Sequence, residues 1–216
     1  MIAGPSGVGK GTVVRRVLET VPDLELSVSV TTRRRRPSER DGVDYRFVDE
    51  GEFDRLIEAG ELLEWAEVFD ARYGTPAGPI RGALEQGRDA LLEIDVQGAR
   101  QVREAMPGAV MIFLVPPSLQ ELERRLRTRG TEDEERLARR LATASRELEA
   151  RDWFDHEVVN DELERASSQV AAIIEATRGS SHRLQRAGSD GRRTDRGSQS
   201  TPAQDAAEDA EGNPHP

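Results

Sequence analysis

The run Gly4-Pro5-Ser6-Gly7-Val8-Gly9-Lys10-Gly11-Thr12 has the residue types and spacing of a phosphate-binding loop. Its glycines let backbone N–H groups converge on phosphate oxygens, and Lys10 would reach the terminal phosphates as a point charge. The pattern G-x-x-x-x-G-K-[ST] calls for a Mg²⁺-binding hydroxyl at position 11, where this chain has glycine. The run therefore predicts a polyphosphate site, and Thr12 offers the nearest remaining hydroxyl for Mg²⁺.

An ordinary glycine-rich turn is the alternative, and the residues on either side argue against it. Ile2-Ala3 is apolar, and Val13, Val14 and Val17 follow at helical spacing. This is the strand–loop–helix setting that aims a helix N-terminus at an anion. A central strand usually needs about five residues. Because only three residues precede Gly4, we expect the natural start of the protein to lie upstream of Met1.

A second phosphate site is predicted at the run Arg33-Arg34-Arg35-Arg36. Arginine forks match phosphate oxygens bidentately, and Arg33 and Arg36 are the candidates. A solvated basic run is one alternative. A nucleic-acid patch is another, but it would need interleaved aromatic residues or a basic domain. A phosphate-binding loop with a separate arginine clamp implies two phosphorylated ligands in one cleft, as in a kinase that acts on a nucleotide.

Glu64 lies in the apolar stretch Leu62-Leu63-Glu64-Trp65, where a carboxylate is costly without a partner. A guanine edge offers N1–H and N2–H₂ donors to such a carboxylate, and adenine has neither. A salt bridge within the protein is the alternative. Tyr45 and Tyr73 lie in glycine-containing loops, where each could hold a phosphate or be a core ring with a solvated hydroxyl.

Glu93 and Asp95 lie on one face of a predicted strand, because side chains alternate along a strand. Two carboxylates beside a lysine and two polyphosphates suit Mg²⁺ and the positioning of an acceptor, with a structural pair as the alternative. Arginines also crowd the span from about Glu121 to Arg140, which could close over phosphates as a lid or be a solvated face.

The elements that must position these residues alternate between apolar strands and helices, which predicts a parallel α/β sheet. The side chains from Leu24 to Thr32 alternate as in one half-buried strand. Ligands gather at the carboxyl ends of parallel strands, where the loop, Glu93, Asp95 and Asn160 all fall. The region from about Ser27 to Pro79 interrupts the alternation and predicts an inserted substrate lobe.

The composition excludes several classes of protein. The 216 residues carry a net charge of −10 and no cysteine, so neither a nucleic acid nor a membrane surface is the expected partner. No apolar run approaches the roughly 20 residues of a membrane span. We expect a soluble cytoplasmic protein with a folded domain over residues 1–178. Residues 179–216 are rich in small and charged side chains and predict a disordered tail.

With these residues assembled, the chain closely resembles guanylate kinases. The motifs that carry the resemblance are GPSGVGKGT, SVSVTTRRRRPSERDGVDY, ELLEWAEVF, YGT, LLEIDVQGA, PPS, RGTEDEE and VVND, in order over most of residues 3–178. The resemblance implies an α/β P-loop fold of three layers, with a central parallel sheet, a GMP-binding lobe at about 27–80 and a mobile lid at 121–150. It also implies transfer of the γ-phosphoryl group of ATP to GMP or dGMP, with Mg²⁺, by a monomer or homodimer.

The resemblance also implies roles for individual residues. The GMP site would comprise Ser29, Glu64 and Thr75 at the guanine, Arg33, Arg36, Tyr45 and Tyr73 at the phosphate, and Glu93 and Asp95 nearby. ATP would be held by residues 4–12 and Asn160, and the catalytic set would be Lys10, Arg125, Arg129 and Arg140. Asp95 would share Mg²⁺ with Thr12. No covalent nucleophile is needed, because positioning and charge neutralisation suffice.

Three residues depart from the pattern of the family: Gly11 stands in place of Ser, Glu93 in place of a frequent Asp, and Arg72 in place of a common Tyr. We expect Gly11 to rearrange or reduce the support for Mg²⁺. One alternative is a guanylate-kinase-like scaffold domain that binds phosphopeptides, although such domains degrade the P-loop and lid. Another is a P-loop kinase for a different phosphorylated metabolite, against which Glu64 with Ser29 and Thr75 argues.

Overall fold

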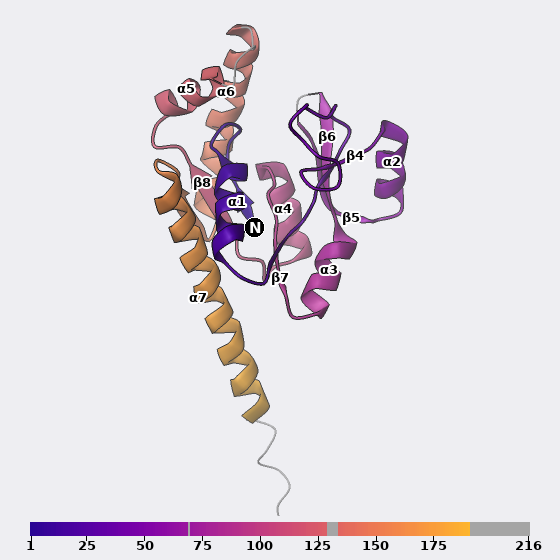
Figure 1. The fold of residues 1–216 in the computed structure, drawn as a ribbon, viewed down its shortest axis with the longest axis vertical. Helices are drawn as coiled ribbons and strands as arrows, with labels where there is room; N and C mark the ends of the chain where they lie inside the picture. The colour runs from indigo at the N-terminus through magenta and orange to yellow at the C-terminus, as the bar shows by residue number, and fades with distance from the viewer. Residues whose placement is uncertain (69, 129–133, 191–216) are drawn as a thin grey trace, which may run out of the picture. The chain divides into compact units, whose positions relative to one another are not determined.

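The computed structural model describes residues 1–68, 70–128 and 134–190. Its core is a parallel sheet of strands in the order β2 (Leu24–Leu26), β7 (Asp89–Leu91), β1 (Ile2–Ala3), β8 (Ile112–Val115) and β9 (His156–Val159) (Figure 1). The two halves of this order meet at Ile2, whose N–H donates to the Leu92 carbonyl at 2.8 Å and whose carbonyl accepts from Ile94 at 3.2 Å. The predicted α/β fold with a central parallel sheet is confirmed.

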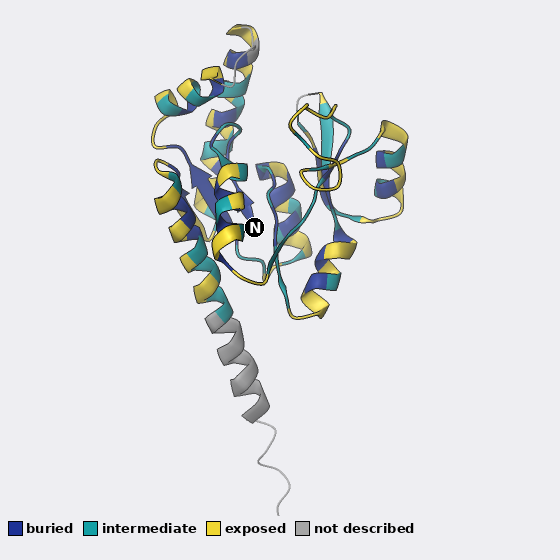
Figure 2. Ribbon diagram, viewed as in Figure 1, coloured by how far each residue is buried: buried dark blue, intermediate teal, exposed yellow. Residues whose placement is uncertain are grey.

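Helices cover both faces of this sheet, as the side chains of β8 show. Ile112 and Leu114 join one apolar cluster, with α1 (Lys10–Thr20) and α7 (Leu163–Asp190). Phe113 and Val115 join the other cluster, with α4 (Val96–Ala105) and the 3-10 helix η1 (Glu149–Trp153). Both sets are buried, so the strand is apolar without interruption (Figure 2). The layers are therefore helix, sheet and helix.

A second sheet forms the lobe. Its order is β4 (Arg46–Phe47), β3 (Val30–Thr31), β6 (Ala71–Pro76) and β5 (Leu62–Val68), with α2 (Glu50–Glu58) beside it. The pair β5–β6 is antiparallel and sets Glu64 opposite Thr75. Arg72 on β6 binds Glu50 and Asp54 of α2 and lies 4.6 Å from the Phe53 ring centre, so it fastens the helix to the sheet.

The single strand predicted from Leu24 to Thr32 is wrong, because this segment changes sheet. The Ser27 N–H donates to the Leu91 carbonyl at 3.0 Å, which continues the pairing of β2 with the core. By Val30 the chain pairs with β6 and β4 of the lobe instead. Alternation of side chains reports an extended backbone and does not identify the neighbouring strand. The next helix is α3 (Ala77–Glu85), with Pro76 as its N-cap.

The predicted lid region contains α5 (Leu119–Thr128) and α6 (Glu134–Leu148). They pack through an apolar cluster of Leu122, Leu126, Leu137 and Ala144. Figure 1 shows α5 and α6 on one side of α1, and the lobe strands with α2 on the other side. Arg129, predicted to be catalytic, lies outside the described residues.

The chain divides into two units, Met1–Thr177 and Arg178–Pro216. Helix α7 ends at Asp190, inside the span 179–216 that the sequence predicts to be a disordered tail. The rest of the predicted tail, residues 191–216, lies outside the described residues. Among the helices that the structure describes, none combines the length and apolar character needed to cross a membrane.

Candidate active site

The P-loop connects β1 to α1, and two of its glycines are required by close contacts. Gly4 has φ 150°, and a Cβ there would lie 2.4 Å from the Leu114 carbonyl oxygen. Gly9 caps α1 at φ 98°, and its Cβ would lie 2.7 Å from Asn160 Nδ2. Both positions combine a backbone conformation that side chains disfavour with a lack of space. The loop therefore packs directly on the ends of β8 and β9 and points the α1 N-terminus outward as an anion site.

Lys10 lies over this loop. Its Nζ donates to the Gly4 carbonyl at 2.6 Å and to the Pro5 carbonyl at 3.4 Å. These bonds keep the ammonium group beside the loop amides, where the phosphates of a donor nucleotide would collect. Lys10 therefore lies where its predicted role, contact with the terminal phosphates, requires it to be.

Arg125 and Asn160 brace the loop from behind. Arg125 donates to the carbonyls of Val8 and Asn160 at 3.1 and 2.9 Å, and its Nε to Glu121 at 2.8 Å. The buried Asn160 side chain donates to the same Val8 carbonyl at 2.7 Å. In this structure Arg125, predicted to be catalytic, and Asn160, predicted to bind ATP, both hydrogen-bond to the Val8 carbonyl of the loop.

Two residues of α6 hold Ser6 of the loop. Arg140 donates to the Ser6 hydroxyl at 2.8 Å, and the Ser6 N–H donates to the Glu147 carboxylate at 3.3 Å. Burial raises the pKa of Glu147, while Lys10 and the Ser6 N–H act in the opposite direction. Arg140 and Glu147 are seven residues apart, which is two helical turns and so the same face. That spacing was the available signal for Glu147, which the sequence predictions missed.

The predicted acceptor-phosphate residues gather on the lobe. Arg33 Nε donates to the Tyr73 hydroxyl at 3.1 Å, and its guanidinium lies 5.4 Å from the Tyr45 ring centre. Glu39, which was also missed, accepts from both terminal nitrogens of Arg33, at 2.8 and 3.2 Å. Burial raises the pKa of Tyr45 to about 12, with the Glu93 charge adding to the effect, so its hydroxyl stays protonated. Arg36 is more peripheral, with a side chain 67% exposed and 3.8 Å from Glu39.

Glu64 is buried on β5, the lobe strand that contacts α4, with 5% of the residue exposed. Thr75, fully buried, donates its hydroxyl to Glu64 Oε1 at 2.5 Å. Burial raises the pKa of Glu64 to about 7, and the hydrogen bond from Thr75 opposes this while Asp95 adds to it. The structure provides no salt bridge for Glu64 among the described residues, so the alternative of a salt bridge within the lobe is not what is observed.

Asp95 and Gly98 connect this carboxylate to the core. Asp95 caps α4 by accepting from the Gly98 N–H at 2.8 Å. A Cβ on Gly98 would lie 2.2 Å from Glu64 Oε2, so only glycine lets the carboxylate approach the helix N-terminus. The predicted Mg²⁺ role for Asp95 therefore competes with a structural one. Ser29, the other predicted guanine contact, is half-buried immediately before β3.

A second carboxylate, that of Glu93, approaches the P-loop at Gly11. A Cβ on Gly11 would lie 3.4 Å from both of its oxygens. Thr12, by contrast, is exposed on α1. The described residues contain no group of three or more His, Cys, Asp or Glu side chains able to hold a metal unaided. Mg²⁺ in kinases is held by one or two carboxylates together with substrate phosphates, and Glu93 beside the loop fits that donor set.

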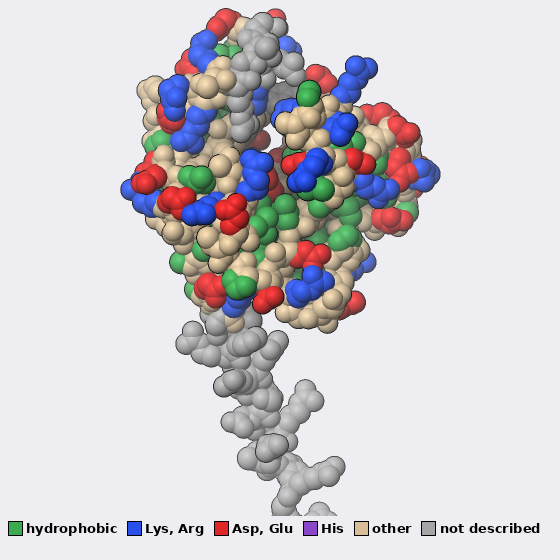
Figure 3. All heavy atoms as spheres, in the orientation of Figure 1, with side chains coloured by type: hydrophobic (Ala, Val, Ile, Leu, Met, Phe, Trp, Pro, Cys, Tyr) green, Lys and Arg blue, Asp and Glu red, His purple; other side chains and the backbone are tan. Residues whose placement is uncertain are grey.

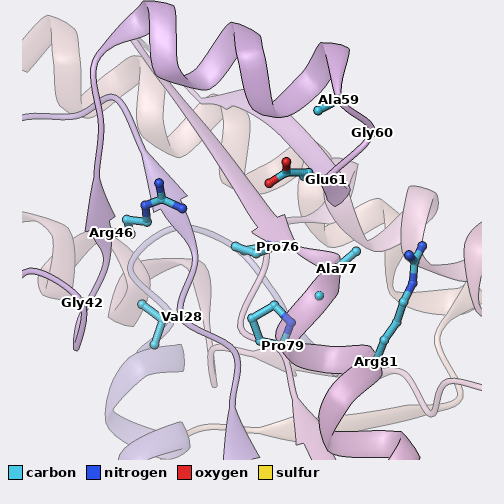
Figure 4. Close-up of a pocket in the computed structure, with 11 residues that line it drawn as sticks. Val28, Gly42, Arg46, Ala59, Gly60, Glu61, Pro76, Ala77, Pro79 and Arg81 are labelled. Carbon is cyan, nitrogen blue, oxygen red and sulfur yellow. The ribbon is translucent and has the colours of Figure 1, made fainter.

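A hollow lies between the lid and the lobe (Figure 3). Figure 3 shows this hollow between the side that carries the lid and the side that carries the lobe, with acidic side chains at its floor and basic ones along its rims. A separate pocket of about 640 Å³ lies where Val28 and Arg46 approach the junction of β6 with α3 (Figure 4). Its lining contains none of the predicted site residues.

The family model for guanylate kinase matches residues 1–177. A guanylate kinase from Nocardia farcinica (strain IFM 10152) is 55% identical over 179 residues, which are 82% of this chain and 93% of the relative. One from Rhodococcus jostii (strain RHA1) is 52% identical, over 81% of this chain and 85% of the relative. The crystal structure of guanylate kinase from Anaplasma phagocytophilum superimposes with a TM-score of 0.69 at 37% identity, covering 82% of this chain and 84% of that one. The chain belongs to the guanylate kinase family.

Proposed function

We propose that this protein transfers the γ-phosphoryl group of ATP to GMP, and also to dGMP, giving ADP and the guanosine diphosphate. The observation that carries the proposal is Glu64, a buried carboxylate with its partner Thr75 in a lobe that faces a P-loop across one hollow. A protein rarely buries a carboxylate without a full set of partners, because the desolvation is costly. A ligand that donates hydrogen bonds to the Glu64 carboxylate would offset this desolvation cost.

A guanine base has the matching chemistry. Its N1–H and N2–H₂ groups form a pair of adjacent donors, and the ionised Glu64 carboxylate offers two acceptor oxygens. Adenine has an acceptor at N1 and hydrogen at C2, so it would add no donor to the hydrogen bond that the buried Glu64 carboxylate accepts from Thr75. Such a loss is expected to discriminate strongly between substrates.

The acceptor phosphate would lie between Arg33, Tyr45 and Tyr73. Glu39 holds Arg33 from the far side, and its hydrogen bonds with Arg33 and Arg36 keep the Glu39 pKa below its ordinary value although burial acts the other way. Glu39 therefore remains charged and fixes the guanidinium before a ligand arrives. Such preorganisation lowers the cost of binding.

In the transfer, an oxygen of the GMP phosphate attacks the γ-phosphorus of ATP, and the bond to the bridging oxygen breaks with its electron pair leaving on ADP. Mg²⁺ bound to the phosphates would neutralise part of their charge. Lys10 and Arg140 would supply the remaining positive charge from the loop and α6. The residues of this chain thus contribute alignment and charge, and none acts as a covalent nucleophile.

The scaffold alternative is not favoured. The P-loop is complete in its glycines and lysine, Arg140 contacts Ser6, and the relatives matched over most of the chain carry the name guanylate kinase. A cytoplasmic location and a monomeric or homodimeric state belong to the same proposal.

A panel of nucleoside monophosphates tests the function directly. With ATP and Mg²⁺ in an assay coupled to ADP release, we expect turnover with GMP and dGMP and almost none with AMP, CMP or UMP. Equal turnover with AMP would refute the assignment of guanine to Glu64. Tight phosphopeptide binding without any turnover would support the scaffold instead.

The affinity for GMP should depend on pH through Glu64. The free protein holds this proton up to about pH 7, whereas the guanine donors require the ionised carboxylate. GMP binding should therefore weaken as pH falls below about 7, approaching tenfold per pH unit, and should release a proton near neutrality. Calorimetry in buffers of different ionisation enthalpy measures this release. Because the phosphate of GMP titrates near pH 6, the Glu64→Gln variant serves as the reference, and an identical pH dependence in that variant would contradict the assignment.

A further inference from the structure

Position 11 of the P-loop is a glycine and has no side chain. The carboxylate of Glu93 lies beside it. A Cβ on Gly11 would lie 3.4 Å from Glu93 Oε1 and from Oε2, and 3.8 Å from Cδ. Because both oxygens are nearer than the carbon, the open end of the carboxylate points at residue 11. The side on which a serine or threonine would carry its hydroxyl therefore meets two acceptor oxygens.

Glu93 is fixed to the same frame as the loop. The backbone on either side of it, at Leu92 and Ile94, is hydrogen-bonded to Ile2, two residues before the loop begins. Residues Ile2 and Glu93 also form a parallel bridge. The backbone that carries Glu93 is therefore held beside the start of the P-loop by the central sheet.

Glu93 also lies between the donor and acceptor sides of the hollow. Its charge contributes to the raised pKa of Tyr45 on the acceptor side, while its oxygens face the loop on the donor side. The other two candidates for a metal are placed less well. Asp95 has one oxygen on the Gly98 N–H, and Thr12 is exposed.

We propose that Glu93 supplies the protein oxygen for the Mg²⁺ of the donor nucleotide, in the place where the loop pattern has a hydroxyl at position 11. Gly11, which has no hydroxyl of its own, then lies beside this carboxylate. A carboxylate is a hard oxygen ligand of the kind that Mg²⁺ prefers, and it adds a full negative charge where a hydroxyl offers a dipole. The inference deepens the proposed kinase function and rests on it.

The test measures metal binding instead of turnover, with Mn²⁺ as a paramagnetic probe. Titration of the ADP complex, with free Mn²⁺ followed by electron paramagnetic resonance, gives the metal affinity. We expect Glu93→Gln to weaken Mn²⁺ binding by about tenfold or more, the scale seen when groups that support a metal are removed. Its affinity for ADP in the presence of EDTA should match that of the unmodified protein.

A second substitution makes the test specific to residue 11. Gly11→Ser, combined with Glu93→Gln, should recover part of the Mn²⁺ affinity, because it restores the hydroxyl that the loop pattern calls for. Glu104→Gln removes the same charge from an exposed position on α4 and should leave Mn²⁺ binding unchanged. If Glu93→Gln proves unfolded by circular dichroism, Glu93→Asp retracts the carboxylate by one methylene and should weaken Mn²⁺ binding alone.

The inference is overturned if the folded Glu93 variant binds Mn²⁺ in its ADP complex as tightly as the unmodified protein and Glu104→Gln do. It is also overturned if ADP affinity in EDTA falls by the same factor as Mn²⁺ affinity, because the role would then be structural. Failure of the unmodified protein to bind ADP at all would instead reject the kinase function itself. The two failures are therefore distinguishable.

Discussion

Replacing Lys10 with alanine is expected to lower kcat by about 10²–10³-fold, the effect of removing one preorganised charge from a transferring group. GMP affinity should change little, because the residues assigned to GMP lie on the lobe and at the end of β7. The Lys10 ammonium group is held over the loop by the Gly4 and Pro5 carbonyls, so its position is set before ATP arrives. Steady-state kinetics with both substrates varied, together with GMP binding by calorimetry, checks the two halves of this expectation.

The matched control is Arg15→Ala, which removes one positive charge from an exposed position on the same helix. Its kcat should stay near that of the unmodified protein. A comparable loss in both variants would show that net charge matters and not the position of Lys10.

The sequence offers a second measurement for the same residue, because Lys10 is its only lysine. Reductive methylation followed by peptide mass spectrometry therefore reports on one side-chain amine. ADP with Mg²⁺ should protect Lys10 from modification, whereas GMP alone should not. Equal protection by GMP would place Lys10 on the acceptor side and refute the assignment.

Replacing Glu64 with glutamine is expected to raise KM for GMP by roughly 10²–10⁴-fold, because two hydrogen bonds to a charged acceptor, each contributing about 1.5–3 kcal/mol, are lost or weakened. Discrimination against AMP should fall with it. The glutamine amide can keep the hydrogen bond from Thr75, but it presents N–H groups to the guanine donors. Kinetics with GMP and AMP as competing acceptors measures the change.

The same substitution should not harm the fold. Since the Glu64 pKa is about 7 in the folded protein and 4.5 ordinarily, the free energy of unfolding falls as pH rises from 4.5 to 7 on account of this residue. At pH 8 the cost is on the order of 3 kcal/mol, and glutamine avoids it. The ligand-free Glu64→Gln protein should therefore melt at a higher temperature at pH 8. Glu67→Gln, exposed on the same strand, should change neither KM nor melting temperature.

A lower melting temperature together with the weaker GMP binding would indicate that Glu64 acts through structure and not through the base. The melting temperature rises while GMP binding weakens only if the Glu64 carboxylate destabilises the free protein and binds the ligand. This opposition between stability and function is common where a site holds a strained or desolvated group.

Several features could be predicted from the sequence because they depend on short stretches of chain. The P-loop is one, since nine consecutive residues fix both its glycine conformations and the position of Lys10. The alternation of apolar strands with helices is another, and it predicted the parallel α/β sheet. The chemistry of Glu64 also followed from residue type and setting, because a carboxylate among apolar residues needs a partner wherever it lies.

Other features depended on contacts between distant segments. The switch of the segment Leu24–Thr32 from one sheet to the other is set by the partner strands β7 and β6, which its own side chains do not encode. The roles of Arg125 and Asn160 at the Val8 carbonyl join residues 117 and 152 positions apart. The Ser6 N–H meets Glu147 across 141 positions. A local sequence pattern indicates backbone geometry and amphipathicity. It carries no information on which distant residues come into contact.

The sequence by itself predicted a polyphosphate loop, an arginine clamp and a carboxylate suited to guanine, because each prediction follows from residue types at short spacing. Only the tertiary structure decided which carboxylate serves which site. In the structure Asp95 caps the N-terminus of α4, and the Glu93 carboxylate lies beside Gly11. The physical reason is that these assignments depend on distances between segments that are far apart in the sequence, such as the 3.4 Å that would separate a Cβ on Gly11 from the Glu93 oxygens.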